Sequence, residues 1–176
     1  MNERKGAVTF QGNPLTLLGK ELNVGEKMHE AELTGNDMKP VKLSSYKGNI
    51  CVICSVPSLD TPVCDMETRR FNEEAGKFGK DVNILTVSMD LPFAQKRWCG
   101  AAGVERVTTL SDYRAASFGI AYGVLIEELR LLARAVFVVD REGVVRYVQV
   151  MHELTSEPDY AAVLKAVKEV TAKLSS

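Results

Sequence analysis

The chain has 176 residues, a formal net charge of −1, 45% hydrophobic residues and 26% charged residues, as expected of one globular domain. Acids and bases are mixed along the chain, which excludes a basic face for nucleic acid or for a membrane surface. The first six residues are too polar for a signal peptide, and the apolar runs at 49–56 and 135–139 are too short to span a membrane. We therefore expect a single domain over residues 1–176 in the cytoplasm, where structural disulfides are rare.

The first elements are predicted to be a β-hairpin and an irregular segment. Residues 7–10 and 15–18 have the apolar pattern of two short strands, and Gly12, Asn13 and Pro14 between them predict a turn. The polar residues that follow, up to about Tyr46, show no period of a strand or a helix. Irregular structure is the expectation for this segment.

The middle of the chain alternates between strand and helix patterns. The nearly continuous apolar run at 50–56 is typical of a strand that is covered on both faces. After a loop, Val63, Phe71, Ala75 and Phe78 recur at helical spacing, and Gly79 is expected to close that helix. The elements predicted next are a strand at 82–87, a short helix from 92 to about 99, a strand at 107–110 and a helical stretch at 112–118.

The last third predicts a hairpin and a helix. Residues 135–139 and 144–150 form two strands around a turn at 140–143 that ends in glycine. Residues 159–174 predict an amphipathic helix with Ala162, Val163, Ala166, Val167, Val170 and Leu174 on one face. Alternation followed by a terminal hairpin and helix is the thioredoxin-like α/β arrangement, a mixed central sheet flanked by helices. Here an N-terminal β-hairpin precedes it.

The four cysteines are the residues with the most informative chemistry, and Cys64 is the first of them to consider. Thr61 is a suitable N-cap and Pro62 prefers the first helical position, so Cys64 falls in the first helical turn. Unpaired backbone N–H groups and the positive end of the helix dipole there favour the thiolate, which is the nucleophilic form. The alternative is a small apolar residue that packs the start of the helix. The position favours a reactive thiol.

Cys99 lies near the end of the second predicted helix. Gly100 and Gly103 make that helix end easy to unwind, which would expose the thiol. Taken alone, Cys99 is interpreted as a buried helix cysteine. Paired with a reactive Cys64 it becomes a candidate resolving thiol, although the spacing of the two residues does not establish that they meet.

Cys51 and Cys54 form a C-x-x-C pattern that suggests a thioredoxin-type redox pair. Both residues lie within the apolar strand, however, and an offset of three directs their side chains to opposite faces. We interpret them as core cysteines. No second pair of ligands with metal-site spacing follows, so zinc is not expected, and His29 and His152 are interpreted as surface or half-buried polar residues.

Arg134 stands at the start of the predicted strand 135–139. One interpretation is a charge at the end of a strand whose side chain reaches water. The other is a permanent cation directed at the Cys64 thiolate, which would stabilise the thiolate and bind peroxide oxygens. The residues themselves leave both interpretations open.

Residues 57–64, with the pattern P-S-x-D-T-x-V-C, resemble the peroxidatic motif of peroxiredoxins, in the form used by the bacterial thiol peroxidase subfamily. The resemblance covers nearly the whole chain and continues at residues 8–14, 69–72, 90–95, 98–100, 109–111, 121–123, 132–135 and 157–160. Cys51 and Cys54 are not part of the catalytic pattern of that family. They are expected to be packing residues or secondary sites of oxidation.

The resemblance implies a thiol-dependent peroxidase that reduces hydrogen peroxide and organic hydroperoxides. It implies that Cys64 is the peroxidatic cysteine, that Thr61 and Arg134 activate it, and that Pro57 shields the pocket. Cys99 would be the resolving cysteine, which forms an intramolecular disulfide with Cys64. Thioredoxin would be the reductant, no metal, haem or flavin would be needed, and a homodimer is the common assembly.

Two other functions remain open at this level. One is a disulfide reductase that uses Cys51 and Cys54. The other is a redox sensor or binding protein on the same fold, in which Cys64 is oxidised without turnover. The sequence does not decide which hydroperoxide is preferred.

Overall fold

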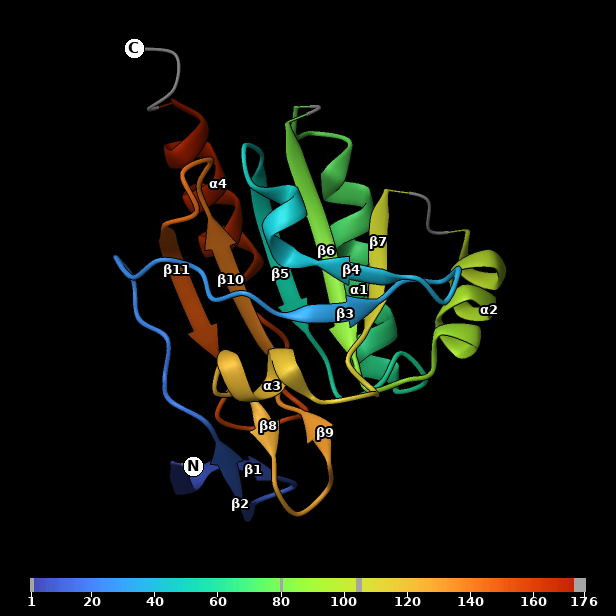
Figure 1. Ribbon diagram of the computed structural model, residues 1–176, viewed down its shortest axis with the longest axis vertical. Helices are drawn as coiled ribbons and strands as arrows, with labels where there is room; N and C mark the ends of the chain where they lie inside the picture. Colours follow the sequence, from blue (N-terminus) through green and yellow to red (C-terminus); the bar gives the residue numbers. More distant parts are fainter. Residues whose placement is uncertain (1, 80, 104–105, 173–176) are drawn as a thin grey trace.

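The computed structural model describes residues 2–79, 81–103 and 106–172 (Figure 1). The main sheet has seven strands, in the order β11 (Val145–Val150), β10 (Ala135–Val139), β5 (Ile50–Ser55), β6 (Val82–Ser88), β7 (Val107–Ser111), β3 (Glu32–Thr34) and β4 (Pro40–Lys42). β5, β6 and β7 are parallel, whereas β10, β11, β3 and β4 pair antiparallel to their neighbours. The predicted mixed α/β sheet is confirmed.

The predicted N-terminal hairpin is also confirmed, and it belongs to a second, smaller sheet. β1 (Glu3–Phe10) and β2 (Asn13–Leu18) pair antiparallel, and β2 continues the sheet to β8 (Leu125–Ile126) and β9 (Leu131–Leu132). β8 and β9 have two residues each, which is too short for any alternating pattern to predict them.

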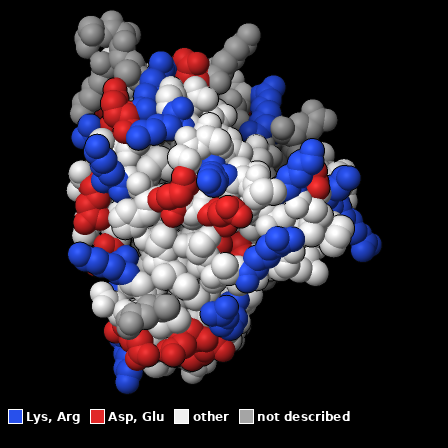
Figure 2. Space-filling model, viewed as in Figure 1, with Lys and Arg blue, Asp and Glu red and all other residues white. Residues whose placement is uncertain are grey.

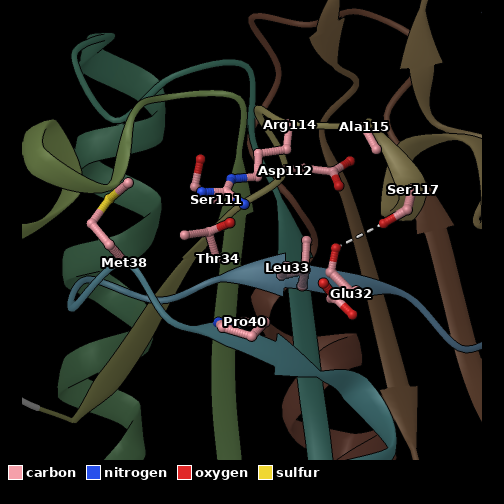
Figure 3. A pocket seen from close by; sticks show the side chains of 10 residues that line it. All are labelled: Glu32, Leu33, Thr34, Met38, Pro40, Ser111, Asp112, Arg114, Ala115 and Ser117. Atoms are coloured by element: carbon pink, nitrogen blue, oxygen red, sulfur yellow. Dashed lines mark hydrogen bonds between the residues drawn. The ribbon is translucent and has the colours of Figure 1, made fainter.

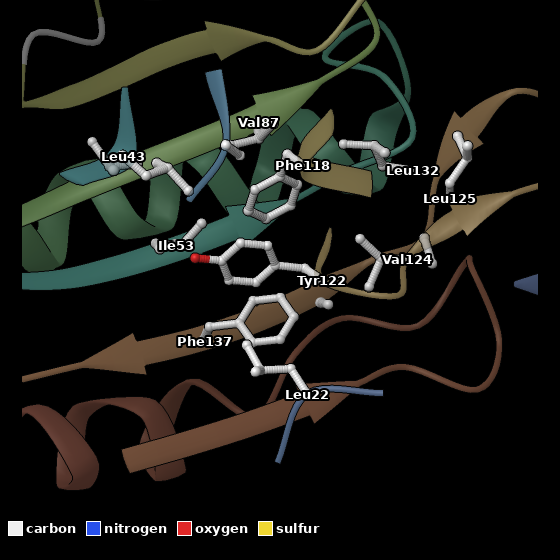
Figure 4. Close-up of a cluster of buried hydrophobic side chains, with 14 of the residues drawn as sticks. Leu22, Leu43, Ile53, Val87, Phe118, Tyr122, Val124, Leu125, Leu132 and Phe137 are labelled. Carbon is white, nitrogen blue, oxygen red and sulfur yellow. The ribbon is translucent and has the colours of Figure 1, made fainter. Parts of the chain in front are cut away.

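Helices cover both faces of the main sheet. α1 (Pro62–Ala75) and α4 (Tyr160–Ala172) pack on one face, and α2 (Pro92–Ala102) packs beside β7. The other face carries η1 (Leu43–Tyr46) and α3 (Ser117–Ala121), with an aromatic group at its centre (Figure 4). In that group the rings of Phe118 and Tyr122 are stacked, with their centroids 4.3 Å apart. The rings of Tyr122 and Phe137 pack edge to face, with their centroids 5.3 Å apart. The apolar strands of the main sheet therefore have a hydrophobic core on each face, and β5 is covered on both faces as predicted.

Several helix ends differ from the sequence prediction. α1 ends at Ala75 because the Gly76 N–H turns back to the carbonyls of Glu73 and Glu74, so Phe78 and Gly79 lie beyond the helix. α2 runs through Gly100 to Ala102 and ends where Gly103 takes a left-handed conformation, with φ of 67°. The predicted last helical residue, Leu174, lies outside the described residues.

The segment up to Tyr46, expected to be irregular, contains β3, β4 and η1. Leu33 and Leu43 are buried there, with 1% and 0% of their surface exposed, so isolated apolar residues rather than a periodic run fasten this segment to the core. α3 begins at Ser117, not at Asp112. Asp112 is placed before the helix, where its carboxylate accepts the N–H groups of Phe118 and Gly119.

None of the helices in the described part of the chain is long and apolar enough to cross a bilayer. Basic and acidic side chains alternate over the face drawn in Figure 2, and acidic side chains gather at the end that carries the smaller sheet.

Glu153 fastens the N-terminal hairpin to the main sheet. Its carboxylate accepts hydrogen bonds from the Gly12 N–H at 2.9 Å and from the Thr9 hydroxyl at 2.9 Å. It also accepts bonds from the backbone and the hydroxyl of Thr155. The backbone adds two bonds, from the Thr9 N–H to the His152 carbonyl and from the Leu154 N–H to the Thr9 carbonyl. The segment 152–155 is therefore held in place by the start of the chain.

These hydrogen bonds, first those from the Thr155 and Gly12 backbones, lower the pKa of Glu153 from its ordinary value of 4.5 to about 2. A lowered pKa contributes stability that is present above pH 4.5 and is lost as the pH falls through about 2. We expect Glu153→Gln to lower the midpoint of denaturant unfolding at pH 7, and the difference from the wild type to shrink as the pH falls from 5 to 2. The exposed Glu73→Gln is the control and should leave the midpoint unchanged. A pH-independent difference would contradict the role of the carboxylate charge.

Candidate active site

Cys64 lies in the first turn of α1, at the third helical position, as the sequence predicted. Thr61 is the N-cap residue with an extended backbone, and its carbonyl accepts the Asp65 N–H at 3.0 Å. The Cys64 side chain is 0% exposed and packs in a small cluster with Val56 and Leu59, against which Trp98 of α2 lies. The thiol is thus a buried group at the positive end of a helix, under an indole ring.

The Thr61 hydroxyl does not cap the helix. It donates to the Ser58 carbonyl at 2.8 Å, which engages its only proton. Its oxygen is therefore left as an acceptor, suited to take a hydrogen bond from a thiol or from a peroxide. Pro57 is buried two residues after the end of β5, at the start of the same loop.

Asp90 holds this loop in place. Its carboxylate accepts bonds from the Ser58 hydroxyl at 2.7 Å, from the Leu59 N–H at 2.9 Å and from the Ser88 hydroxyl at 2.7 Å. Gln95, fully buried on α2, in turn donates to the Ser88 hydroxyl at 2.9 Å. The loop before Cys64 is therefore tied to the carboxyl end of β6 and to α2.

Arg134 precedes β10 and is 2% exposed, so the interpretation of a side chain that reaches water is wrong. Its Nε donates to the Leu154 carbonyl at 3.0 Å, and its Nη1 lies 3.5 Å from Oε2 of Glu67 on α1. Glu67 is one helical turn after Cys64. Among the described residues, no hydrogen bond joins the Arg134 guanidinium to the Cys64 thiol, so Glu67 is the observed connection between Arg134 and α1.

Burial raises the pKa of Glu67 to about 8, although the Arg134 charge acts in the opposite direction. Near neutral pH the carboxyl therefore holds its proton much of the time, and the charge of Arg134 is then not cancelled. Such a cation in a dry environment is able to stabilise a nearby anion.

Cys99 lies on α2 and is partly exposed, and all four cysteines are free thiols. Its sulfur lies 3.5 Å from the Thr109 hydroxyl and lines a hollow with Asn36 and Tyr46, on the β7 side of α2. The neighbouring Trp98, not Cys99, covers Cys64. The structure does not bring the two predicted redox cysteines into contact.

Cys51 and Cys54 are buried on opposite faces of β5, with 2% and 1% of their surface exposed. Burial raises the pKa of the Cys51 thiol to about 11 and that of the Cys54 thiol well above its ordinary range. The prediction of two core cysteines is confirmed. The disulfide-reductase alternative loses its physical basis, since these two thiols face apart.

Further hollows mark the described surface, and two of them are next to loops at the ends of strands of the main sheet. One lies beside the loop before Cys64, lined by Asp60, Phe93, Ala94, Arg97, Trp98 and Ala101. The other lies between β3, β4 and the segment after β7, and its lining includes Glu32, Asp112 and Arg114 (Figure 3). The first adjoins Trp98 and is therefore the nearer approach to Cys64.

Sequence reasoning missed three residues of the site. Glu67 looks like an ordinary helix residue, Asp90 like a loop residue and Trp98 like part of an apolar helix face. Their partners are 32, 33 or 67 residues away in the chain. Only one signal was available for Glu67, its position one helical turn after Cys64 on the same face of the predicted helix.

Comparisons with known proteins find relatives over most of this chain. Residues 23–164 match the Redoxin family model. The chain is 55% identical to a thiol peroxidase of Halalkalibacterium halodurans over 92% of its own length and 97% of the relative's. It is 51% identical to a thiol peroxidase of Bacillus subtilis, over 92% of its own length and 96% of the relative's.

Solved structures show the same fold. A peroxiredoxin-like protein from Aquifex aeolicus, 44% identical, superposes with a TM-score of 0.88 over 97% of this chain and 99% of that one. A thiol peroxidase from Chromobacterium violaceum, 20% identical, superposes with a TM-score of 0.84 over 94% of this chain and 97% of that one. The family model and the relatives cover most of the sequence, and the chain therefore belongs to the redoxin family, among the thiol peroxidases, as a peroxiredoxin-type thiol-dependent peroxidase.

Proposed function

We propose that Cys64 is the peroxidatic cysteine of this thiol peroxidase. The observation that carries the proposal is its place, in the first turn of a helix and one turn before the buried Glu67, which pairs with Arg134. The Cys64 thiolate attacks the terminal oxygen of a hydroperoxide and the O–O bond breaks. The sulfur becomes a sulfenic acid, and the alkoxide or hydroxide leaves and takes up one proton. Both hydrogen peroxide and organic hydroperoxides fit this step.

Arg134 and Thr61 assist that attack in our proposal. The Arg134 guanidinium stabilises the thiolate and the negative charge that develops on the leaving oxygen. The Thr61 oxygen accepts a hydrogen bond from the peroxide, since its own proton is held by Ser58. Pro57, buried at the start of the loop, shields the pocket from water.

Cys99 is proposed to resolve the sulfenic acid. Its thiol attacks the Cys64 sulfur, an intramolecular disulfide forms, and water leaves. Since Cys99 faces the hollow beside Thr109, the C-terminal part of α2 must unwind for this step. Gly100 and Gly103 make such unwinding inexpensive.

An external dithiol then reduces the Cys64–Cys99 disulfide, which returns both thiols and leaves the reductant as a disulfide. Thioredoxin is our proposed reductant, and we further propose a cytoplasmic location and a homodimer. A thioredoxin-coupled assay with hydrogen peroxide and with an organic hydroperoxide tests this cycle. Turnover with peroxide separates it from a redox sensor, which would be oxidised once without turnover.

Cys64→Ser is expected to abolish peroxide reduction, because a serine hydroxyl is a far weaker nucleophile than a thiolate. The coupled assay should fall to the background rate for both peroxides. Cys54→Ser is the control, since that thiol is buried on β5, and it should retain turnover if it folds, as far-ultraviolet circular dichroism will show. Activity that survives in Cys64→Ser would remove the central assignment.

Cys99→Ser is expected to complete one oxidation of Cys64 and then stop, because no internal thiol attacks the sulfenic acid. Trapping with dimedone and mass spectrometry should find one sulfenic acid per chain at Cys64. Full multi-turnover activity with thioredoxin in this variant would show that Cys99 is not the resolving residue. Cys51→Ser is the matched control and should keep the disulfide.

Arg134→Ala is expected to slow the oxidation of Cys64 by about a hundredfold, the usual effect of losing one charge-stabilising donor. Because Glu67 holds its proton near neutral pH, the stability of this variant should fall below that of the wild type mainly as the pH rises through about 8, where the carboxylate would be buried without its cation. Adding Glu67→Gln should remove that loss at high pH but should not restore the rate. Single-turnover oxidation and thiol alkylation as a function of pH provide the measurement, and an unchanged rate would contradict the role of Arg134.

Glu67→Gln alone is the reference for that pair of variants. Because the raised pKa of Glu67 contributes stability below pH 4.5 that is lost as the pH rises through about 8, the wild type should lose stability over this range. The Gln variant should lack that particular decline. Identical pH profiles for both proteins would show that Glu67 does not titrate in this way.

A further inference from the structure

Asp65, Arg69 and Trp98 form a polar connection between α1 and α2, which we call the α1–α2 latch. The Trp98 indole N–H donates to one carboxylate oxygen of Asp65 at 2.9 Å, and Arg69 Nε donates to the other at 2.8 Å. The Arg69 guanidinium lies over the Trp98 ring, 5.8 Å from its centroid. Its Nη1 also donates to the Ala102 carbonyl, at the last residue of α2, at 3.3 Å.

The latch joins the residues that are next in the chain to the two thiols of the proposed cycle. Asp65 follows Cys64 in the chain, and Trp98 precedes Cys99. Trp98 also packs on the cluster that contains Cys64. Any unwinding of the end of α2 that turns Cys99 toward Cys64 must break the indole bond, the stacking and the bond to Ala102.

The strength of these contacts suits a reversible connection. Asp65 and Arg69 are 35% and 48% exposed at their side chains, so solvent screens their ion pair and each contact is weak alone. The indole hydrogen bond, the cation–π contact and the bond to the Ala102 carbonyl all act on the same end of α2. The Ala102 carbonyl is one that the helix itself leaves unpaired, so together these contacts favour the folded form of that end. The latch is therefore able to shift a local equilibrium without controlling the global stability.

We propose that the α1–α2 latch sets the rate at which α2 unwinds and so decides the fate of oxidised Cys64. This inference rests on the proposed function. In one fate the Cys99 thiol attacks the sulfenic acid, the disulfide forms and water leaves. In the other, a second hydroperoxide transfers an oxygen to the sulfenic acid, its O–O bond breaks, and sulfinic acid and an alcohol or water result. A closed latch lengthens the life of the sulfenic acid and favours the second fate when peroxide is abundant.

The chain offers a matched control for Arg69. The next residue, Arg70, makes the same kinds of contact from the same helix, an ion pair with Glu74 four residues on and a position 5.0 Å over the ring of Tyr160. Those contacts face α4 instead of α2. Arg69→Gln and Arg70→Gln therefore remove equal charges and similar contacts, and only the first opens the latch.

Hydrogen exchange of the reduced protein is the first measurement. In Arg69→Gln and in Asp65→Asn the backbone amides of residues 96–102 should exchange roughly fivefold faster than in the wild type, the factor expected for one hydrogen bond. Arg70→Gln should leave them unchanged. In a double-mutant cycle on the same amides, Trp98→Phe should add less in the Asp65→Asn background than in the wild type. Equal protection in Arg69→Gln and Arg70→Gln would overturn the latch.

Resolution is the second measurement. A single equivalent of peroxide is mixed with each protein, and the fluorescence of Trp98, the only tryptophan in the chain, is followed while quenched samples are analysed for the Cys64–Cys99 disulfide. Arg69→Gln should form the disulfide roughly fivefold faster than Arg70→Gln. With excess peroxide, it should also accumulate less sulfinic acid per turnover, while the preceding oxidation of Cys64 keeps its rate.

Faster exchange in Arg69→Gln with an unchanged disulfide rate would overturn the proposed control of resolution. Failure of the proposed function is recognised separately. If the wild type itself forms no Cys64–Cys99 disulfide, the assignment of Cys99 fails without reference to any latch variant, and with it the control of resolution. The exchange data would then show only whether the latch holds α2.

Discussion

The buried guanidinium of Arg134 is the constraint on which the arrangement of this protein depends. A permanent cation with 2% exposure needs partners, and it finds them in two parts of the chain, the Leu154 carbonyl and the carboxyl of Glu67. Leu154 belongs to the segment 152–155, which the N-terminal hairpin holds through Thr9 and Glu153. The start of the chain, the segment after the main sheet and the first turns of α1 are therefore joined at one charge, whose partner Glu67 is one helical turn after Cys64.

The ion pair between Arg134 and Glu67 is not a fully satisfied one. The two groups are 3.5 Å apart, and neither carboxylate oxygen of Glu67 has a well-aligned hydrogen bond within the described residues. Burial also raises the pKa of Glu67 to about 8. A strong, fully ionised pair would neutralise the cation, whereas a carboxyl that holds its proton leaves a positive field at the first turns of α1. The cost of burying these groups is consistent with a role in chemistry more than in stability.

Much of this could be predicted from the sequence where local rules decide the structure. The Thr61-Pro62 pair placed Cys64 in the first helical turn, and the apolar runs predicted β5, β6 and β10. The alternation of side chains along a strand predicted that Cys51 and Cys54 lie on opposite faces of β5.

The sequence predictions were wrong or incomplete where contacts between residues distant in the chain determine the structure. β3 and η1 are fastened to the core by the buried Leu33 and Leu43. α3 begins late because the Asp112 carboxylate accepts N–H groups of its first turn, and Asp90 acts on a loop 32 residues away. The burial of Arg134 likewise depends on two distant partners that no local pattern reveals.

The positions of Trp98 and Cys99 explain why the two thiols are kept apart. A peroxidatic thiol is most reactive in a dry, fixed environment, whereas a resolving thiol must travel to it. Adjacent residues on a helix point in directions about 100° apart, so one helix is able to cover Cys64 with Trp98 while it turns Cys99 toward Thr109. In the proposed cycle, covering of Cys64 and resolution by Cys99 exclude each other in time, because α2 must unwind before Cys99 is able to reach Cys64. The end of α2 must then alternate between a folded and an unwound form. The α1–α2 latch suits this alternation, because it is weak, partly exposed and located at that end.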